Sequence, residues 1–217
     1  SLKRGHSIGA AVLKSGDFGD TWTDLTGKAV VVPLEYHASI SVPHVFASSD
    51  PRLGGMAVDP QNRLWVLTHC AKPGLFQGLL SRWTKKGWKT IEIGKFLPPE
   101  RGCCSGVVSA DTQGRIHLLV EAVLRNKIKP NGAMFGHPSS EIFHLWSTDD
   151  GATFSCNQIS PSDPEIPNWH PSISKPGPFH PVDTPVFLYT HGKNQGNAGQ
   201  GCRHTLAADV YCVMPEE

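Results

Sequence analysis

The sequence predicts an all-β protein assembled from repeated β-meanders, and three observations support this prediction. The segments SGDFGDTW (15–22) and STDDGATF (147–154) share Ser, Asp, Gly, Thr and an aromatic residue at the same offsets. VDPQNRLWVL (58–67) matches ADTQGRIHLL (110–119) in Asp, Gln and Arg, followed by an apolar run. The 217 residues include 22 glycines and 18 prolines, as expected for short strands joined by many turns.

The first repeat predicts a tight turn. Asp17 and Asp149 can accept hydrogen bonds from backbone N–H groups, and Gly19 and Gly151 can adopt a positive φ. The aromatic residue that ends each copy can pack onto the sheet. Two copies in one chain indicate repeated β-units.

The second repeat predicts the blades of a β-propeller. Each copy reads as a strand, a polar turn and a second strand, and two further apolar runs follow it. Four-stranded meanders that recur about every 50 residues are typical of propeller blades. The predicted blade parts are 7–27 with two strands, 54–94 and 105–160 with four each, and 168–213 with three.

These parts amount to about three and a half blades, whereas propellers typically have about 4–8. We therefore expect residues 1–217 to be the C-terminal half of a single propeller domain. The missing N-terminal half would come from the same polypeptide or from a second chain.

The composition limits which binding partners and which cellular compartment the sequence predicts. The formal net charge of +1 argues against a surface for duplex nucleic acid, and no apolar run is long enough to span a bilayer. Six cysteines, an even number, fit an oxidising compartment, and Cys202 and Cys212 are near enough in sequence for a local disulfide. Reduced thiols and metal ligands remain open alternatives.

The order of strands in a meander predicts where a ligand would bind. The turns between first and second strands, and between third and fourth, lie at one end of the blades. The other connections lie at the opposite end, where propellers place ligand sites around the central channel. This end collects histidine, arginine, tyrosine and cysteine residues: Tyr36, Arg52, His69, Cys103, Cys104, Arg125, His170, His191 and Arg203.

The Ser-x-Asp-x-Gly-x-Thr-Trp turn resembles the Asp-box (BNR) repeat of sialidases and related propellers. The stretches SGDFGDTWTDLTGKAVVVPL, GGMAVDPQNRLWVL and TLAADVYCVMP resemble the BNR-4 group, which includes polysaccharide lyases of the ulvan lyase and rhamnose–glucuronate lyase type. The resemblance covers nearly the whole chain. It implies a propeller of seven blades when complete and a secreted or periplasmic lyase that cleaves a uronate-containing acidic polysaccharide.

The resemblance also implies roles for individual residues. β-Elimination needs a cation to neutralise the uronate carboxylate, a base for the C5 proton and an acid for the departing oxygen. Arg52 is expected to neutralise the carboxylate and Tyr36 to act as the acid, or as the base with an upstream histidine as its partner. Five residues are expected to bind substrate: His69, Arg125, His170, His191 and Arg203.

No cofactor is expected to be required for catalysis, but some propellers of the ulvan lyase type carry a structural zinc. The candidate ligands here are His69, Cys103, Cys104 and His117, although they lack the CxxC…CxxC spacing. Each candidate residue also has an ordinary interpretation: a packed loop tyrosine, a solvated arginine, or a histidine that caps a strand.

Two other functions remain open. A sialidase-like glycoside hydrolase needs an arginine triad, a nucleophilic tyrosine and an acidic residue, and Glu121 is the only obvious carboxylate at the channel end of a strand. A propeller that only binds carbohydrate is the third alternative.

Overall fold

The computed structural model describes residues 12–33, 51–70, 75–129, 132, 134–176, 181–193 and 208–214, without the side chain of Pro51. Tyr36, Cys202 and Arg203 lie outside the described residues. The chain divides into two units, residues 1–51 and 52–217, and each is described by itself. Among the described residues, no helix is long and apolar enough to cross a membrane.

The first unit contains a small antiparallel sheet of β1 (Leu13–Lys14), β2 (Trp22–Asp24) and β3 (Ala29–Val30), in that order. The Ser-Asp-Gly turn of residues 15–22 joins β1 to β2. The sequence predicted two strands in this region, and the structure adds β3 after a turn that begins at Asp24.

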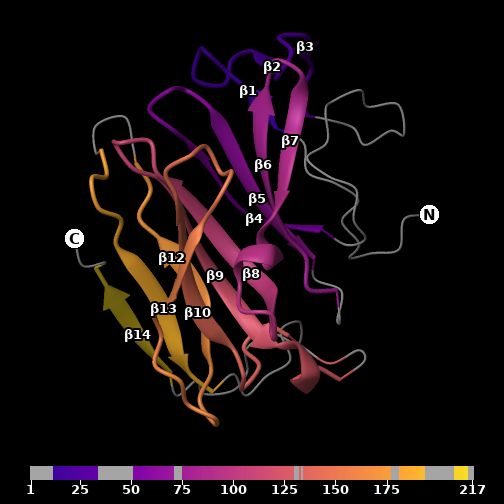
Figure 1. The fold of residues 1–217 in the computed structure, drawn as a ribbon. Helices are drawn as coiled ribbons and strands as arrows, with labels where there is room; N and C mark the ends of the chain where they lie inside the picture. The colour runs from indigo at the N-terminus through magenta and orange to yellow at the C-terminus, as the bar shows by residue number, and fades with distance from the viewer. Residues whose placement is uncertain are drawn as a thin grey trace. The chain divides into compact units, whose positions relative to one another are not determined.

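The second unit contains three antiparallel sheets whose strands are ordered as in the sequence (Figure 1). Two short 3-10 helices, η1 (Ile93–Phe96) and η2 (Arg125–Lys127), follow β7 and β9. The first sheet comprises β4 (Pro51–Val58), β5 (Leu64–Cys70), β6 (Gly78–Thr84) and β7 (Gly87–Glu92). The second comprises β8 (Arg101–Ala110), β9 (Ile116–Leu124), β10 (Glu141–Ser147) and β11 (Ser155–Gln158), and the third β12 (Asn168–Ile173), β13 (Phe187–Gly192) and β14 (Ala208–Val213).

The two Ser-Asp-Gly turns form the same set of hydrogen bonds, which confirms the predicted turn. Asp17 Oδ1 accepts the Thr21 N–H at 3.0 Å, and Asp149 Oδ1 accepts the Thr153 N–H at 2.9 Å. In each copy the serine hydroxyl accepts the glycine N–H, and that glycine has a positive φ, 102° in Gly19 and 77° in Gly151. The geometry is therefore encoded within eight residues.

The second repeat also forms one recurring turn, which occurs three times among the described residues. Asp59 Oδ1 accepts the N–H groups of Gln61 and Arg63, and Asp111 Oδ1 accepts those of Gln113 and Arg115. Asp24 repeats the pattern with the N–H groups of Thr26 and Lys28, at 2.8 and 3.0 Å. An aspartate followed by Gly or Asn three positions later and a basic residue four positions later is the shared signal.

The sheets of the second unit pack face to face in chain order. Trp65 and Leu80 of the first sheet share one buried cluster with Leu118 and Leu145 of the second. Ile142 of the second sheet contributes to another buried cluster, which includes Ile173, Phe187 and Tyr189 of the third. Because neighbouring sheets cover both of its faces, β9 is buried along nearly its whole length and is mostly apolar, with His117 and Glu121 as its buried polar residues.

The first strands of the three sheets converge. A Cβ atom at Gly54 of β4 would overlap the carbonyl oxygen of Gly106 of β8. A Cβ atom at Gly55 would lie 3.3 Å from Nζ of Lys175, which follows β12, and 3.8 Å from the Val108 nitrogen. Four-stranded meanders whose first strands meet in this way are propeller blades. The chain thus folds as part of a β-propeller.

We predict that Gly54→Ala destabilises the protein by about 1–3 kcal/mol, because the methyl group must displace backbone atoms of β8. Gly94→Ala is the matched control, since its Cβ would meet no atom closer than 3.8 Å. We expect the control to change stability by less than about 0.5 kcal/mol. Urea unfolding measures both variants, and equal effects would contradict the close approach of the inner strands.

Candidate functional site

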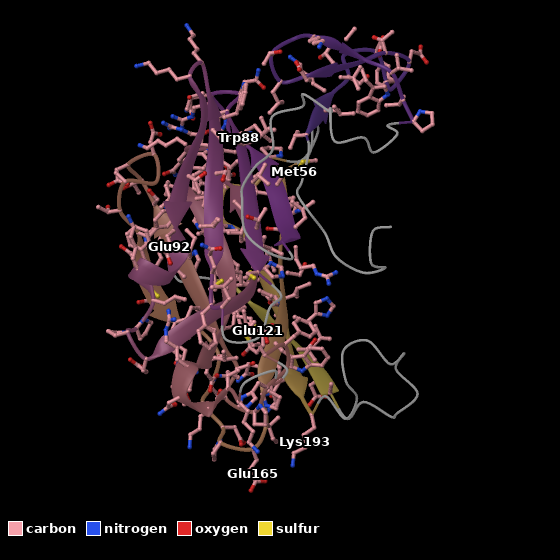
Figure 2. All side chains as sticks on the ribbon, turned by 90° about the vertical axis from the view of Figure 1, so that its right-hand side faces the viewer. Met56, Trp88, Glu92, Glu121, Glu165 and Lys193 are labelled. Carbon is pink, nitrogen blue, oxygen red and sulfur yellow. The ribbon has the colours of Figure 1, made fainter. Side chains whose placement is uncertain are left out.

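Apart from His117, the candidate residues that the structure describes lie at one end of the blades, where the sequence analysis expected a ligand site. Arg52 lies near the start of β4, His69 near the end of β5, and His170 in the first half of β12. Figure 2 labels Trp88 near the opposite end, where the aspartate turns lie, and Glu165 and Lys193 at the end that carries the candidate residues.

The structure brings Arg52 and His69 together on the neighbouring strands β4 and β5. Burial of the imidazole, the larger cause, and the charge of Arg52 together lower the pKa of His69 to about 4. Nδ1 of His69 is buried and has no hydrogen-bond partner among the described residues. His69 is therefore a neutral imidazole at pH 7, held beside the exposed Arg52.

His170 lies on an inner strand in a strained conformation. Its φ is +56°, and the pairing of β12 with β13 shifts register between Trp169 and Ser172. The side chain is exposed, with its ring centroid 5.9 Å from that of Phe135 and 6.0 Å from that of Trp169. A residue other than glycine in the left-handed region costs roughly 1–3 kcal/mol, and such strain often occurs at functional sites.

Glu121 of β9 is fully buried. Its carboxylate accepts hydrogen bonds from the Ser105 hydroxyl at 2.8 Å, the Ser140 hydroxyl at 3.0 Å and the Gly136 N–H at 2.9 Å. Burial raises the pKa of Glu121, and the hydrogen bonds from Gly136, Ser105 and Ser140 oppose that rise. A substrate therefore cannot reach this carboxylate.

A second buried carboxylate, Glu141, anchors His191 through Asn168. Asn168 Nδ2 donates to Glu141 Oε2 at 2.8 Å and to the Pro161 carbonyl at 2.8 Å, so Asn168 Oδ1 is left to accept. It lies 2.9 Å from Nδ1 of His191, which must carry the proton. The sequence predicted His191 but missed Asn168 and Glu141, because their contacts join residues far apart in the chain.

Arg125, another predicted substrate-binding residue, lies in η2 and is exposed. Its Nε donates to the carbonyl of Arg101 at 2.8 Å, and its guanidinium lies over the ring of Phe76 at 5.0 Å. Part of its hydrogen-bonding capacity is thus used within the fold.

The four candidate zinc ligands do not fit one metal site. Cys103 of β8 lies opposite Ala122 of β9, and His117 lies five positions before Ala122 on β9. The positions of Cys103 and His117 are therefore about 17 Å apart along the sheet. Cys103 and Cys104 belong to different buried clusters, and burial raises the pKa of the Cys103 thiol to about 12. No group of three or more His, Cys, Asp or Glu residues in the described part of the chain could hold a metal ion.

His117 instead belongs to a buried chain of hydrogen bonds at the turn end. Its Nε2 lies 3.2 Å from Asp111 Oδ2, and its Nδ1 lies 3.0 Å from Nε2 of His144. The two imidazole rings are stacked, with an angle of 11° between their planes. Burial, the largest cause, and the charges of His117 and Arg115 together lower the pKa of His144 to about 3.

Comparisons with known proteins indicate the fold alone. No family model and no curated protein matches the chain. A crystal structure of a protein of unknown function from Dyadobacter fermentans is 16% identical, with a TM-score of 0.50 over 98% of this chain and 52% of that one. The chain therefore spans about half the length of this structural relative. A Hadza microbial sialidase, Hz136, is 15% identical, with a TM-score of 0.43 over 76% of this chain and 31% of that one.

We predict that Arg52→Gln raises the pKa of His69 above about 4, because a cation that opposes imidazolium formation is removed. The pKa should stay below 6.5, since burial is the larger cause of the shift. NMR titration of the imidazole measures it, with Arg125→Gln as the control that leaves it unchanged. An unchanged pKa in Arg52→Gln would show that the two side chains are not neighbours.

We also predict that His144 makes the fold sensitive to acid. Its folded pKa lies below its unfolded value, so the unfolded chain binds more protons as the pH falls from 6.5 towards 3. This histidine then lowers the free energy of unfolding by up to about 1.4 kcal/mol per pH unit. His144→Phe should flatten the fall seen by urea unfolding between pH 6.5 and 4, and an equal slope in the two proteins would contradict the prediction.

Proposed function

We propose that the propeller to which this chain contributes is a polysaccharide lyase that cleaves a uronate-containing acidic polysaccharide by β-elimination. The observation that carries the proposal is the pairing of Arg52, an exposed cation, with the neutral imidazole of His69. A cation for the carboxylate and a neutral imidazole are two groups that this reaction needs side by side.

In the proposed reaction, Arg52 pairs with the uronate carboxylate and makes the C5 proton more acidic. A neutral imidazole at this end of the blades accepts that proton, and His69 is the one beside Arg52. The electron pair of the C5–H bond forms the C4=C5 double bond while the C4–O bond breaks. The departing oxygen takes a proton from the acid, a role that the sequence assigns to Tyr36.

The buried carboxylates favour elimination over hydrolysis. Most glycoside hydrolases need two carboxyl groups that reach the sugar, and the sialidase-like alternative needs one acidic residue besides its nucleophilic tyrosine. Glu121 and Glu141 are 0% and 3% exposed, and each is engaged by hydroxyl, amide or N–H donors of the protein. These two residues therefore suit a supporting role behind the site. A sialidase-like hydrolase and a carbohydrate-binding propeller are the competing outcomes of the test below.

The proposal extends to partners and location. The substrate is an acidic polysaccharide, the remaining blades complete the ring, and neither nucleic acid nor a membrane is a partner. Because such a polymer lies outside the cytoplasm, the proposed protein is secreted or periplasmic.

The test is to incubate the complete propeller with a panel of uronate polymers and follow the absorbance near ~235 nm, where an unsaturated uronate absorbs. We expect Arg52→Ala to reduce the rate by about 100-fold or more. Arg52→Lys should recover part of that loss, because it keeps the charge without the bidentate geometry.

The matched control is Arg82→Ala, since Arg82 lies at the opposite end, 3.3 Å from Asp150. It should retain full activity. New reducing ends without the chromophore would identify a hydrolase, and binding without cleavage would identify a carbohydrate-binding protein. Either result, or full activity in Arg52→Ala, would overturn the assignment.

A further inference from the structure

We propose that Asn168 is a positioning residue of the candidate site. It holds the imidazole of His191 in the form whose Nε2 carries no proton, so that Nε2 accepts a hydrogen bond from a hydroxyl group of the polysaccharide. This inference rests on the proposed function and deepens it, because it assigns one contact with the sugar and the chemical group that makes it.

The first step is the orientation of the Asn168 side chain, which is completely buried at the start of β12. One end of its amide lies 2.8 Å from the carbonyl oxygen of Pro161 and 2.8 Å from Oε2 of Glu141. A carbonyl oxygen can only accept, so the group that faces Pro161 must be the NH₂ group. Oδ1 of Asn168 is therefore the atom that lies 2.9 Å from Nδ1 of His191.

The second step is that Glu141 prevents the amide from turning over. Its Oε2 also accepts a hydrogen bond from the Ser160 hydroxyl at 2.6 Å. That hydroxyl oxygen accepts the N–H of Ile142 at 2.9 Å, which leaves its own proton for Glu141. If the Asn168 amide turned over, its oxygen would face two acceptors in a buried place, and such unpaired polar contacts are costly.

The third step concerns the protons of His191. Because Oδ1 of Asn168 can only accept, Nδ1 of His191 carries a proton. A neutral imidazole has one N–H group, so its Nε2 is an acceptor. A histidine in water favours the opposite form, with the proton on Nε2, so the protein imposes the less favoured one. The ring of Tyr211 also packs against the imidazole, with centroids 5.3 Å apart and an angle of 74° between the planes.

The fourth step is the location of the imidazole. His191 is half-buried and lies one residue before the end of β13, the second strand of its blade, as His69 does in β5. Asn168 begins β12, and Arg52 lies near the start of β4. Because blades repeat one topology, both imidazoles lie at the same end of the blades. Figure 2 shows Lys193, two residues after His191, at this end.

The decisive measurement is the position of the imidazole proton in the complete propeller, without substrate. The ¹⁵N signals of the His191 ring distinguish a protonated from an unprotonated nitrogen, and they are read at about pH 8.5, above the usual titration range of histidine. We expect Nδ1 to carry the proton. Asn168→Leu, which is similar in size but cannot accept a hydrogen bond, should raise the population protonated on Nε2 about tenfold or more.

The matched control is Gln158→Leu. It removes another carboxamide, whose hydrogen bonds go to the Ser160 carbonyl and the Ser162 hydroxyl. The control should leave the proton of His191 on Nδ1. A wild-type protein protonated on Nε2, an unchanged population in Asn168→Leu, or an equal shift in the control would each overturn the role of Asn168.

A second pair of variants tests the sugar contact. His191→Asn keeps a donor near the place of Nδ1 but loses the acceptor at Nε2, whereas His191→Gln reaches the place of Nε2. We expect His191→Asn to keep a Tm close to that of the wild type and to raise the KM for the cleaved polymer about tenfold or more, with a smaller change in kcat. His191→Gln should recover part of this loss, and an unchanged KM in His191→Asn would overturn the contact.

The two measurements fail separately from the proposed function. A protein inactive on every polymer would refute the lyase, while the ring signals, which are read without substrate, still decide the role of Asn168. If Asn168→Leu does not fold, the wild-type ring signals and the two His191 variants still decide the proposal.

Discussion

The close approach of the inner strands is the constraint on which the rest of the structure depends. At Gly54, no side chain fits between β4 and the carbonyl oxygen of Gly106 in β8. This contact fixes how neighbouring blades meet at the axis and brings the ends of β4, β8 and β12 to a common place. The candidate site is built on those ends, so its geometry follows from backbone packing.

The two ends of the blades have different structural roles. At the turn end, interactions tie neighbouring sheets together: Arg63 Nη1 lies 2.6 Å from Asp150 Oδ1, and the Thr112 hydroxyl donates to Asp183 Oδ1 at 2.5 Å. Hydrogen bonds to aspartate also lower the pKa values of Asp17 and Asp149 to about 2, so these turns stay ionised well into acid. The opposite end keeps Arg52 and His170 exposed.

At the candidate site, the buried carboxylates support the structure, and the exposed cationic and imidazole groups are the ones that could bind a ligand. Glu121 and Glu141 lie inside and organise donors from several elements. Among the described residues, the side chains that a substrate could meet include the exposed Arg52 and His170 and the half-buried His69 and His191. The acidic polymer that we propose as the substrate would suit such a surface, because its carboxylates would meet donors and a cation while the carboxylates of the protein remain covered.

The sequence by itself determined the turns and the meanders, because the hydrogen bonds that form each turn join residues within eight positions. It did not reveal the third aspartate turn at Asp24, which keeps the Asp and the basic residue but lacks the Gln of the other two copies. Only the tertiary structure decided that Glu121 is buried, that His170 is left-handed and that the proposed zinc ligands are separated. Each of these depends on contacts between strands from different parts of the chain, and the residue pattern along a single strand does not predict such contacts.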